Sequence, residues 1–161
     1  MTREDTGGLE GPIQQRIDEA VASQDVIFRN TFPGMLGVHI VEASPGSATG
    51  VLDIGPAVLH PGGYAHGGAI AGFGDTVAAW ATFPSLRPGE VFTTIEFKTN
   101  FLSGVREGRL RGEAATIHRG ARTQVIEVRI ATDDGARKPV AMMIVTQAIL
   151  QARTPEEPSR Y

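Results

Sequence analysis

The stretch HPGGYAHGGAIAGFGDTVAAWATFP, residues 60–84, holds the pattern of one long helix. Between residues 67 and 83, large apolar side chains recur every three or four positions, which places them on one helical face. Pro84 cannot continue a helix, so we expect the helix to end there. The apolar face should be buried against the rest of the domain, and it consists of Ile70, Phe73, Val77, Trp80 and Ala81.

The opposite face of this helix carries small residues and a single charge, the carboxylate of Asp75. A face in contact with water would carry more lysine, glutamate and arginine, so we expect another surface to cover it. In a chain of this size, the cover that we predict is a second copy of the chain. The face consists of Gly68, Ala71, Gly72, Asp75, Ala78, Ala79 and Thr82.

The start of the helix has the composition of an oxyanion hole. His66-Gly67-Gly68 places unobstructed backbone N–H groups at the positive end of the helix dipole, where they could polarise a carbonyl group. The alternative is a loop that uses glycine only for its backbone conformation. For Asp75, the alternative to a chemical role is a structural carboxylate, hydrogen-bonded to neighbouring amides or hydroxyls.

Distance decides how these groups could act together. Gly67 and Asp75 are eight positions apart, about 12 Å along a helix, whereas a reacting carbonyl must lie roughly 3 Å from each group. One helix therefore cannot offer both groups to one carbonyl. Two helices packed antiparallel across a two-fold axis can, which predicts two equivalent sites in a homodimer.

The remaining pattern predicts an α+β domain with an antiparallel sheet packed on one helix. Residues 13–21 have apolar side chains every four positions, as in an amphipathic helix that ends before Pro33. Residues 37–43 and 48–54 have the pattern of two short strands. Four long strands follow the long helix, and we expect hairpin-like turns between them. In the first of these strands, apolar residues alternate with Thr94, Glu96, Lys98 and Asn100.

The chain has 161 residues, 15 Lys and Arg against 18 Asp and Glu, a net charge of −3 and no cysteine. This composition fits one domain and excludes disulfides, thiolate metal sites and cysteine nucleophiles. We expect a flexible arm at residues 1–11, the domain at 12–150 and a flexible tail at 151–161. The acidic balance argues against nucleic-acid binding. Without a signal peptide or an apolar run of about 18 residues, we expect a cytoplasmic protein that does not bind membranes.

The segment HPGGYAHGGAIAGFGD resembles the signature of hotdog-fold thioesterases, in particular the PaaI-type (phenylacetate-degradation) acyl-CoA thioesterases. Their pattern resembles Asn-Pro-x-Gly-x-x-His-Gly-Gly with an acidic residue nine positions after the histidine, the spacing of His66 and Asp75 here. The stretches TTIEFKTNFLSGVREGRLRGEA and IHRGARTQVIEVRIATDDG are also similar, so the resemblance covers residues 32–150. It implies an antiparallel sheet wrapped around one long central helix, a homodimer or dimer of dimers, and hydrolysis of an acyl-CoA without a metal or redox cofactor.

The resemblance also implies roles for individual residues. Gly67 would offer its N–H to the thioester carbonyl, and Asp75 of the partner subunit would be the nucleophile or the general base that activates water. His66 would shape the loop and orient substrate or water, and Gly68 would contact the substrate. Thr94 occupies the place of a hydroxyl that assists the water in some members.

One position departs from the family pattern, because His60 stands where asparagine usually positions the water or the carboxylate. Histidine can also hydrogen-bond, but its charge changes near neutral pH. This departure keeps open a second hypothesis, a non-catalytic acyl-CoA-binding protein that acts as a sensor or carrier. His60 and His66 lack the context of a metal site, so we expect no metal. For the phosphates of coenzyme A we favour Arg119 and Arg122, near predicted turns.

Overall fold

The computed structural model describes residues 7–152, with side chains from residue 13 onward. Most of the flexible arm and tail expected at the two ends lies outside the described residues. Residues 7–11, expected within the arm, belong to the first helix. The helices are α1 (Gly7–Ala22), α2 (Gln24–Ile27), α3 (Phe32–Leu36) and α4 (Gly67–Thr82), with 3-10 turns at Pro56–Val58 and Phe83–Ser85. The strands are β1 (Val38–Ser44), β2 (Ser47–Asp53), β3 (Glu90–Phe101), β4 (Arg109–Arg119), β5 (Thr123–Thr132) and β6 (Pro139–Gln151).

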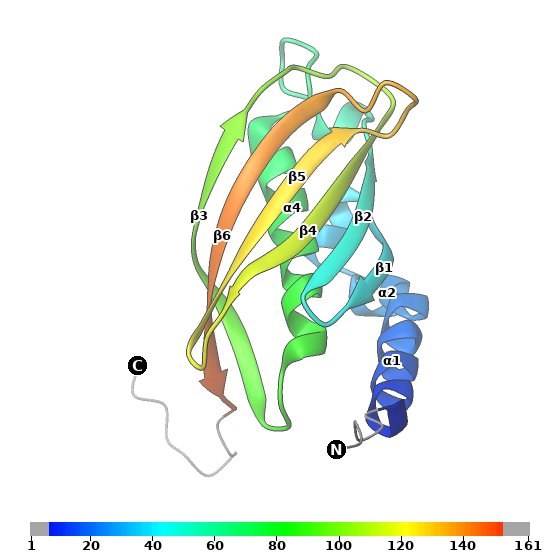
Figure 1. Ribbon diagram of the computed structural model, residues 1–161. Helices are drawn as coiled ribbons and strands as arrows, with labels where there is room; N and C mark the ends of the chain where they lie inside the picture. Colours follow the sequence, from blue (N-terminus) through cyan, green and yellow to red (C-terminus); the bar gives the residue numbers. More distant parts are fainter. Residues whose placement is uncertain (1–6, 153–161) are drawn as a thin grey trace.

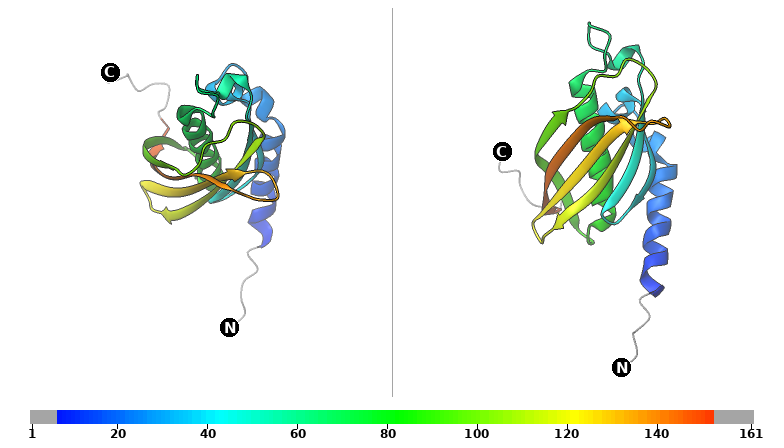
Figure 2. Two further views of the ribbon diagram at one scale, coloured as in Figure 1. Left: turned by 90° about the horizontal axis from the view of Figure 1, so that it is seen from above. Right: turned by 45° about the horizontal axis from the view of Figure 1, so that its top comes forward.

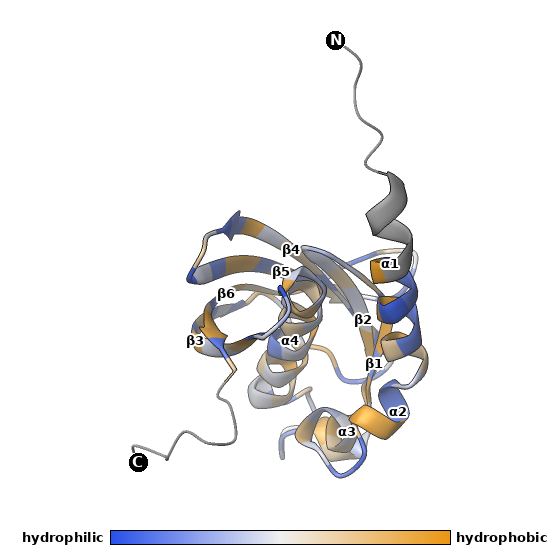
Figure 3. Ribbon diagram, turned by 90° about the horizontal axis from the view of Figure 1, so that it is seen from below, coloured by the Kyte–Doolittle hydropathy of each residue, from blue (hydrophilic) through white to orange (hydrophobic). Residues whose placement is uncertain are grey.

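One antiparallel sheet with the strand order β1-β2-β4-β5-β6-β3 curves around α4 (Figures 1 and 3). The apolar face of α4 is buried against this sheet as expected, and Phe73 and Val77 are completely inaccessible. Gly50 and Gly112 lie where the sheet approaches α4 most closely, because a Cβ at either position would press on Val77 or Phe73. This confirms the predicted hotdog fold, an antiparallel sheet wrapped around one long central helix.

The connection between β3 and β4 differs from the expected hairpin. β3 lies at one edge of the sheet and pairs with β6, whereas β4 pairs with β2 and β5 in the interior. Residues 102–108 therefore cross over between the edge and the middle of the sheet. The N–H of Ala65 donates to the carbonyl of Val105 in this crossover, so the crossover packs against the loop that precedes α4.

A β-bulge in β3 changes which of its residues face α4. The register with β6 shifts between Thr94 and Glu96. Before the shift, Thr94 contacts Asp75 on α4. After it, Phe101 contacts Gly67 on the same helix. The regular alternation expected for this strand would put Thr94 and Phe101 on opposite faces of the sheet, so that expectation is wrong at the bulge.

The small-residue face of α4 is covered in part by the chain itself. Ala78 and Thr82 are fully buried. Phe32 and Leu36 of α3 pack against Gly72, so at Gly72 the cover is not the expected second copy but α3, a helix that the sequence pattern did not predict. Five residues of this face stay at least partly exposed: Gly68, Ala71, Gly72, Asp75 and Ala79. Of these, Ala71, Asp75 and Ala79 form a stripe at four-residue spacing.

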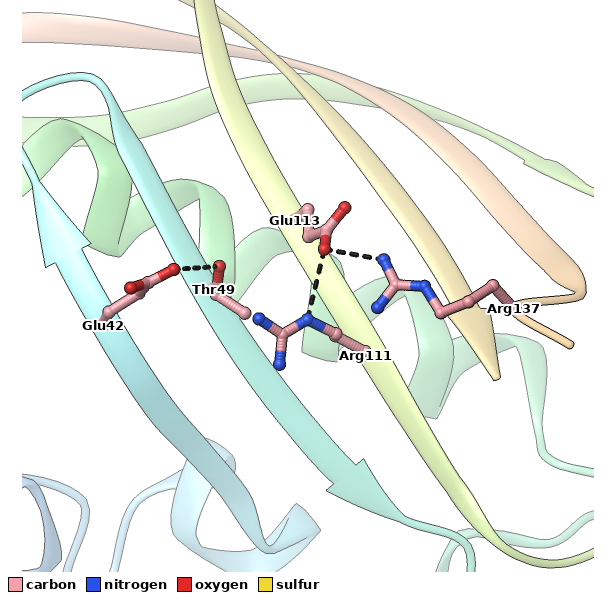
Figure 4. A network of polar contacts seen from close by, with 5 residues as sticks. All are labelled: Glu42, Thr49, Arg111, Glu113 and Arg137. Atoms are coloured by element: carbon pink, nitrogen blue, oxygen red, sulfur yellow. Dashed lines mark hydrogen bonds and ion pairs between the residues drawn. The ribbon is translucent and has the colours of Figure 1, made fainter. Parts of the chain in front are cut away.

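The face of the sheet that points away from α4 carries a network of polar side chains. Figure 4 shows Glu113 on this face accepting hydrogen bonds from Arg111 and from Arg137, while Thr49 donates to Glu42. The helix α1 lies alongside β1, apart from α4 (Figure 2). None of the helices within residues 7–152 is long and apolar enough to cross a bilayer.

Candidate active site

The helix α4 begins at a histidine that caps it with its own side chain. His66 has extended backbone angles (φ −68°, ψ 134°), and its Nδ1 accepts a hydrogen bond of 2.9 Å from the N–H of Gly68. The carbonyl of His66 accepts from the N–H groups of Ala69 and Ile70. Within residues 7–152, the N–H of Gly67 is the amide of this turn that has no acceptor. Gly67 thus keeps a donor for a ligand, whereas the N–H of Gly68 is bound to His66.

The ring of Phe101 lies over Gly67. A Cβ atom at position 67 would be 3.1 Å from the Cζ atom of Phe101, so the missing side chain is what lets the ring approach the helix start. Phe101 is 55% exposed and ends the edge strand β3. An apolar ring beside an amide keeps water away and strengthens the hydrogen bonds that the amide makes. Nothing in the local sequence around Phe101 predicts this contact.

The carboxylate of Asp75 lies half-way along α4 and is bound by one hydroxyl group. Thr94 Oγ1 donates to Asp75 Oδ1 at 2.9 Å. Burial raises the pKa of the Asp75 carboxyl above its ordinary value, and the hydrogen bond from Thr94 offsets part of that rise. The structure therefore brings together two of the predicted site residues, and it leaves Asp75 a stronger base than an exposed aspartate.

The loop before α4 carries a stack of side chains at the surface. His60 and Tyr64 stack with ring centroids 5.9 Å apart, and the guanidinium of Arg106 lies 4.0 Å from the centre of the Tyr64 ring. His60 Nδ1 accepts from the N–H of Gly62 at 2.9 Å, so a neutral His60 carries its proton on Nε2. Arg106 comes from the β3–β4 crossover, which places a cation beside this loop. In the part of the chain that the structure describes, no three His, Asp or Glu side chains come together as metal ligands.

The two arginines expected to bind phosphate lie beyond the other end of α4. Arg119 Nη2 donates to the carbonyl oxygen of Ser85 at 2.6 Å, just after α4. Arg122 lies in the β4–β5 turn, where its backbone carbonyl accepts from the N–H of Ile149. Its guanidinium has no hydrogen-bond or ion-pair partner among residues 13–152. Of the two arginines, Arg122 is therefore the one whose guanidinium group is available to bind a ligand.

Gly67 and Asp75 lie on one helix about 12 Å apart along its axis, so within one chain they do not meet at a common point. The edge strand β3 and the residue after it expose an unusual amount of apolar surface in this chain. Each of five side chains along this edge is at least 43% exposed: Val91, Ile95, Phe97, Phe101 and Leu102. Exposed apolar surface on an edge strand marks an interaction surface.

Comparison with known proteins identifies the family. A family profile described as the thioesterase superfamily matches residues 62–138, which include α4 and the bulge of β3. The chain is also 30% identical over 118 residues to the 1,4-dihydroxy-2-naphthoyl-CoA hydrolase of Listeria monocytogenes, covering 73% of this chain and 94% of that protein. The chain belongs to the thioesterase superfamily. Its reaction class is thioester hydrolysis.

Solved structures of other proteins share the fold of this thioesterase. A thioesterase of Haemophilus influenzae superimposes with a TM-score of 0.78 at 20% identity, covering 85% of this chain and 94% of that one. A variant of a thioesterase from Pseudomonas aeruginosa gives a TM-score of 0.76 at 25% identity, with 81% and 94% coverage. The sheet wrapped around α4 is thus the common architecture.

Proposed function

We propose that this protein is an acyl-CoA thioesterase of the PaaI type, which hydrolyses its substrate to a carboxylic acid and free coenzyme A. The observation that carries the proposal is the pair of groups on α4. The N–H of Gly67 at the helix start has no acceptor within residues 7–152, and Asp75 is a partly buried carboxylate with a raised pKa. A hydrogen-bond donor and a base are what acyl transfer to water requires.

The working unit that we propose is a homodimer with two equivalent composite sites. Antiparallel packing of two α4 helices through the stripe of Ala71, Asp75 and Ala79 would bring Gly67 of one protomer to Asp75 of the other. Small side chains permit such close approach of two helices. The exposed apolar edge of β3 would be covered in the same assembly. Pairing of two dimers is implied by the family resemblance alone.

In this site the N–H of Gly67 would hold the carbonyl oxygen as it becomes negatively charged. Asp75 would either attack the carbonyl carbon or take a proton from an attacking water, with Thr94 fixing the orientation of the carboxylate. With Asp75 as base, the C–O bond to water forms, the C–S bond breaks, and the proton taken from water passes to the thiolate of coenzyme A. With Asp75 as nucleophile, an anhydride forms as the C–S bond breaks, and water then hydrolyses the anhydride, which frees Asp75 and supplies the proton of the thiol. No metal or redox group takes part in this proposal.

The nucleotide of coenzyme A would lie along cationic surface. Arg122 is our proposed phosphate ligand, because its guanidinium is available, and Arg119 would support it. His60, stacked on Tyr64, would contact the substrate in place of the asparagine of the family pattern. The reaction would take place in the cytoplasm.

The experiment that tests this function measures release of free thiol from aryl, short-chain and long-chain acyl-CoA substrates. Asp75→Asn keeps the shape of the side chain and removes the base, so turnover should fall at least ~100-fold. The matched control is Glu96→Gln on β3, an exposed carboxylate that accepts from Thr146, and it should retain full activity. Bound acyl-CoA without turnover on any substrate would contradict the proposal and favour the sensor or carrier.

A further inference from the structure

A row of polar side chains crosses the sheet beneath α4. Thr94, Gln147, Gln124 and Arg119 are successive cross-strand partners on β3, β6, β5 and β4. Directly paired residues of neighbouring strands share one face of the sheet. Because Thr94 contacts Asp75, this face is the one that packs against α4. The polar row therefore begins at the base of the proposed site and runs through the interior.

The far end of the row is anchored to the turn after α4. Gln124 Nε2 donates to Ser85 Oγ at 2.8 Å, and Arg119 donates to the carbonyl of the same serine. Ser85 Oγ in turn donates to the carbonyl of Thr82, the last residue of α4. Gln124 is only 3% exposed, so these contacts hold a buried amide in place.

Gln147 occupies the gap between the two bonded ends of the row. Its side chain is completely buried. Among residues 13–152, neither Nε2 nor Oε1 of this amide has a hydrogen-bond partner. By register, Thr94 lies directly on one side of Gln147 and Gln124 on the other, within the reach of a glutamine side chain since paired Cβ atoms are about 5 Å apart. A buried amide is unfavourable unless its donors and acceptor are satisfied.

The hydroxyl oxygen of Thr94 can accept a hydrogen bond from such a donor. A threonine hydroxyl has one proton and two lone pairs, and Thr94 directs its proton to Asp75. A donor at the oxygen of Thr94 would prevent rotation of the hydroxyl and strengthen the bond to the carboxylate. Gln147 Nε2 is the donor that the register places there. The second N–H of the same amide can then donate to Gln124 Oε1, which also has no partner among residues 13–152.

We propose that Gln147 is a positioning residue, whose amide donates to Thr94 Oγ1, directly or through a bound water, and so holds the Thr94 hydroxyl on Asp75. This inference rests on the proposed function of Asp75 as base or nucleophile. It assigns a functional role to a residue of β6, outside the helix and loop that carry the recognised motif.

Few other groups can control the charge of Asp75. None of the buried side chains of the described chain is charged. The pKa of Asp75 responds to burial and to Thr94. On β3, Glu96 and Lys98 pair with the residues of β6 that point away from α4. On β4, Arg119 is bound to the turn after the helix.

A double-mutant cycle tests the proposal. Gln147→Met keeps the length of the side chain and removes its hydrogen bonds, and Thr94→Val removes the hydroxyl. The pKa of Asp75 is measured by carboxyl ¹³C NMR in the substrate-free protein, and kcat/KM is measured against pH. Gln147→Met should raise the pKa of Asp75 by roughly half a unit to one unit and move the acid limb of kcat/KM to higher pH. In the Thr94→Val background, Gln147→Met should have no further effect on that pKa.

The control variant is Thr99→Val, since Thr99 is also a buried hydroxyl of β3 without a partner among residues 13–152. It should leave the pKa of Asp75 at the wild-type value. Gln147→Asn, too short to reach Thr94, provides a second variant and should behave like Gln147→Met. An unchanged pKa in both Gln147 variants, or a shift that adds in full to that of Thr94→Val, would overturn the proposal. If the wild-type protein hydrolyses no thioester, the proposed function fails, while the NMR measurement still decides the role of Gln147.

Discussion

Thr94 Oγ1 donates a hydrogen bond of 2.9 Å to Asp75 Oδ1 and so links the edge strand β3 to the central helix. The bond exists because the bulge after Thr94 keeps this side chain on the α4 face, together with the aromatic residues that follow. The strand that fixes the carboxylate is thus also the strand whose exposed edge is expected to meet a second copy. Assembly and catalysis would depend on the same element.

The first prediction concerns the stability of Asp75→Asn. The folded-state pKa of Asp75 is raised, so between the unfolded and folded pKa values the native state binds more protons than the unfolded state. Stability is therefore lost as the pH rises through this window, and the loss is complete above the folded pKa. Asp75→Asn should therefore raise Tm at pH 7, and the difference should vanish below about pH 3.5, where the aspartate is protonated in both states.

The control for this prediction is Asp53, a carboxylate whose pKa is shifted in the opposite direction. The ion pair with Arg109 lowers the pKa of Asp53, so its contribution is present above the unfolded pKa and is lost as the pH falls. Asp53→Asn should leave Tm unchanged or slightly lower at pH 7. Thermal unfolding at both pH values measures the two variants, and a lower Tm for Asp75→Asn at pH 7 would contradict the sign.

The second prediction is complementation between two inactive variants. Gly67→Pro deletes the amide hydrogen. Proline is well tolerated at the first position of a helix. The preceding residue, His66, already has the extended backbone angles that a residue before proline prefers. Asp75→Asn removes the base. In a composite site, a mixed dimer keeps one intact pair of Gly67 and Asp75. Because half of randomly assembled dimers are mixed, a 1:1 co-refolded mixture should recover about a quarter of wild-type activity.

Gly67→Ala keeps the amide hydrogen and is the matched control for the loss caused by Gly67→Pro. Its Cβ would contact the exposed ring of Phe101, which can move, so it should retain more activity than Gly67→Pro, whose loss should reach about 100-fold. Thiol release from the mixture and from each variant alone provides the readout. A mixture no more active than its components would show that each site lies within one chain.

The third prediction tests whether Arg122 binds the nucleotide part of the substrate and not the acyl group. Arg122→Met should raise KM for an acyl-CoA about tenfold, the loss of one charge-assisted hydrogen bond. KM for the same acyl group on pantetheine, which lacks the nucleotide phosphates, should not change. Arg109→Met is the control because Arg109 is paired with Asp53. An equal rise in KM for both thioesters would place Arg122 away from the phosphates.

The fourth prediction tests the packing of α4 on the sheet. A Cβ at Gly74 would clash with Sδ of Met143, a fully buried residue of β6. Gly74→Ala should therefore destabilise the protein by about 1–3 kcal/mol, although alanine is the better helix former. Combining it with Met143→Val should restore part of the loss. Urea unfolding measures both, and wild-type stability in Gly74→Ala alone would contradict the close contact.

Local periodicity was sufficient for α4 and its buried face, because Ile70, Phe73 and Val77 are spaced by the geometry of the helix itself. The same reasoning failed at β3. Alternation of side chains cannot reveal the bulge after Thr94, which depends on the register with β6. It also cannot reveal that β3 leaves its neighbour β4 for the edge of the sheet.

The sequence by itself determined the helix, the amide donor of Gly67 at its start and the lone carboxylate of Asp75, since these follow from residues close together in the chain. Only the tertiary structure decided which groups meet them: Thr94 on the carboxylate, Phe101 over the amide, and the amide of Gln147 behind Thr94. The physical reason is that strand order, bulges and register are set by hydrogen bonds between distant segments. A local pattern fixes which face a residue takes on its own element, whereas its partner depends on how the whole sheet closes around the helix.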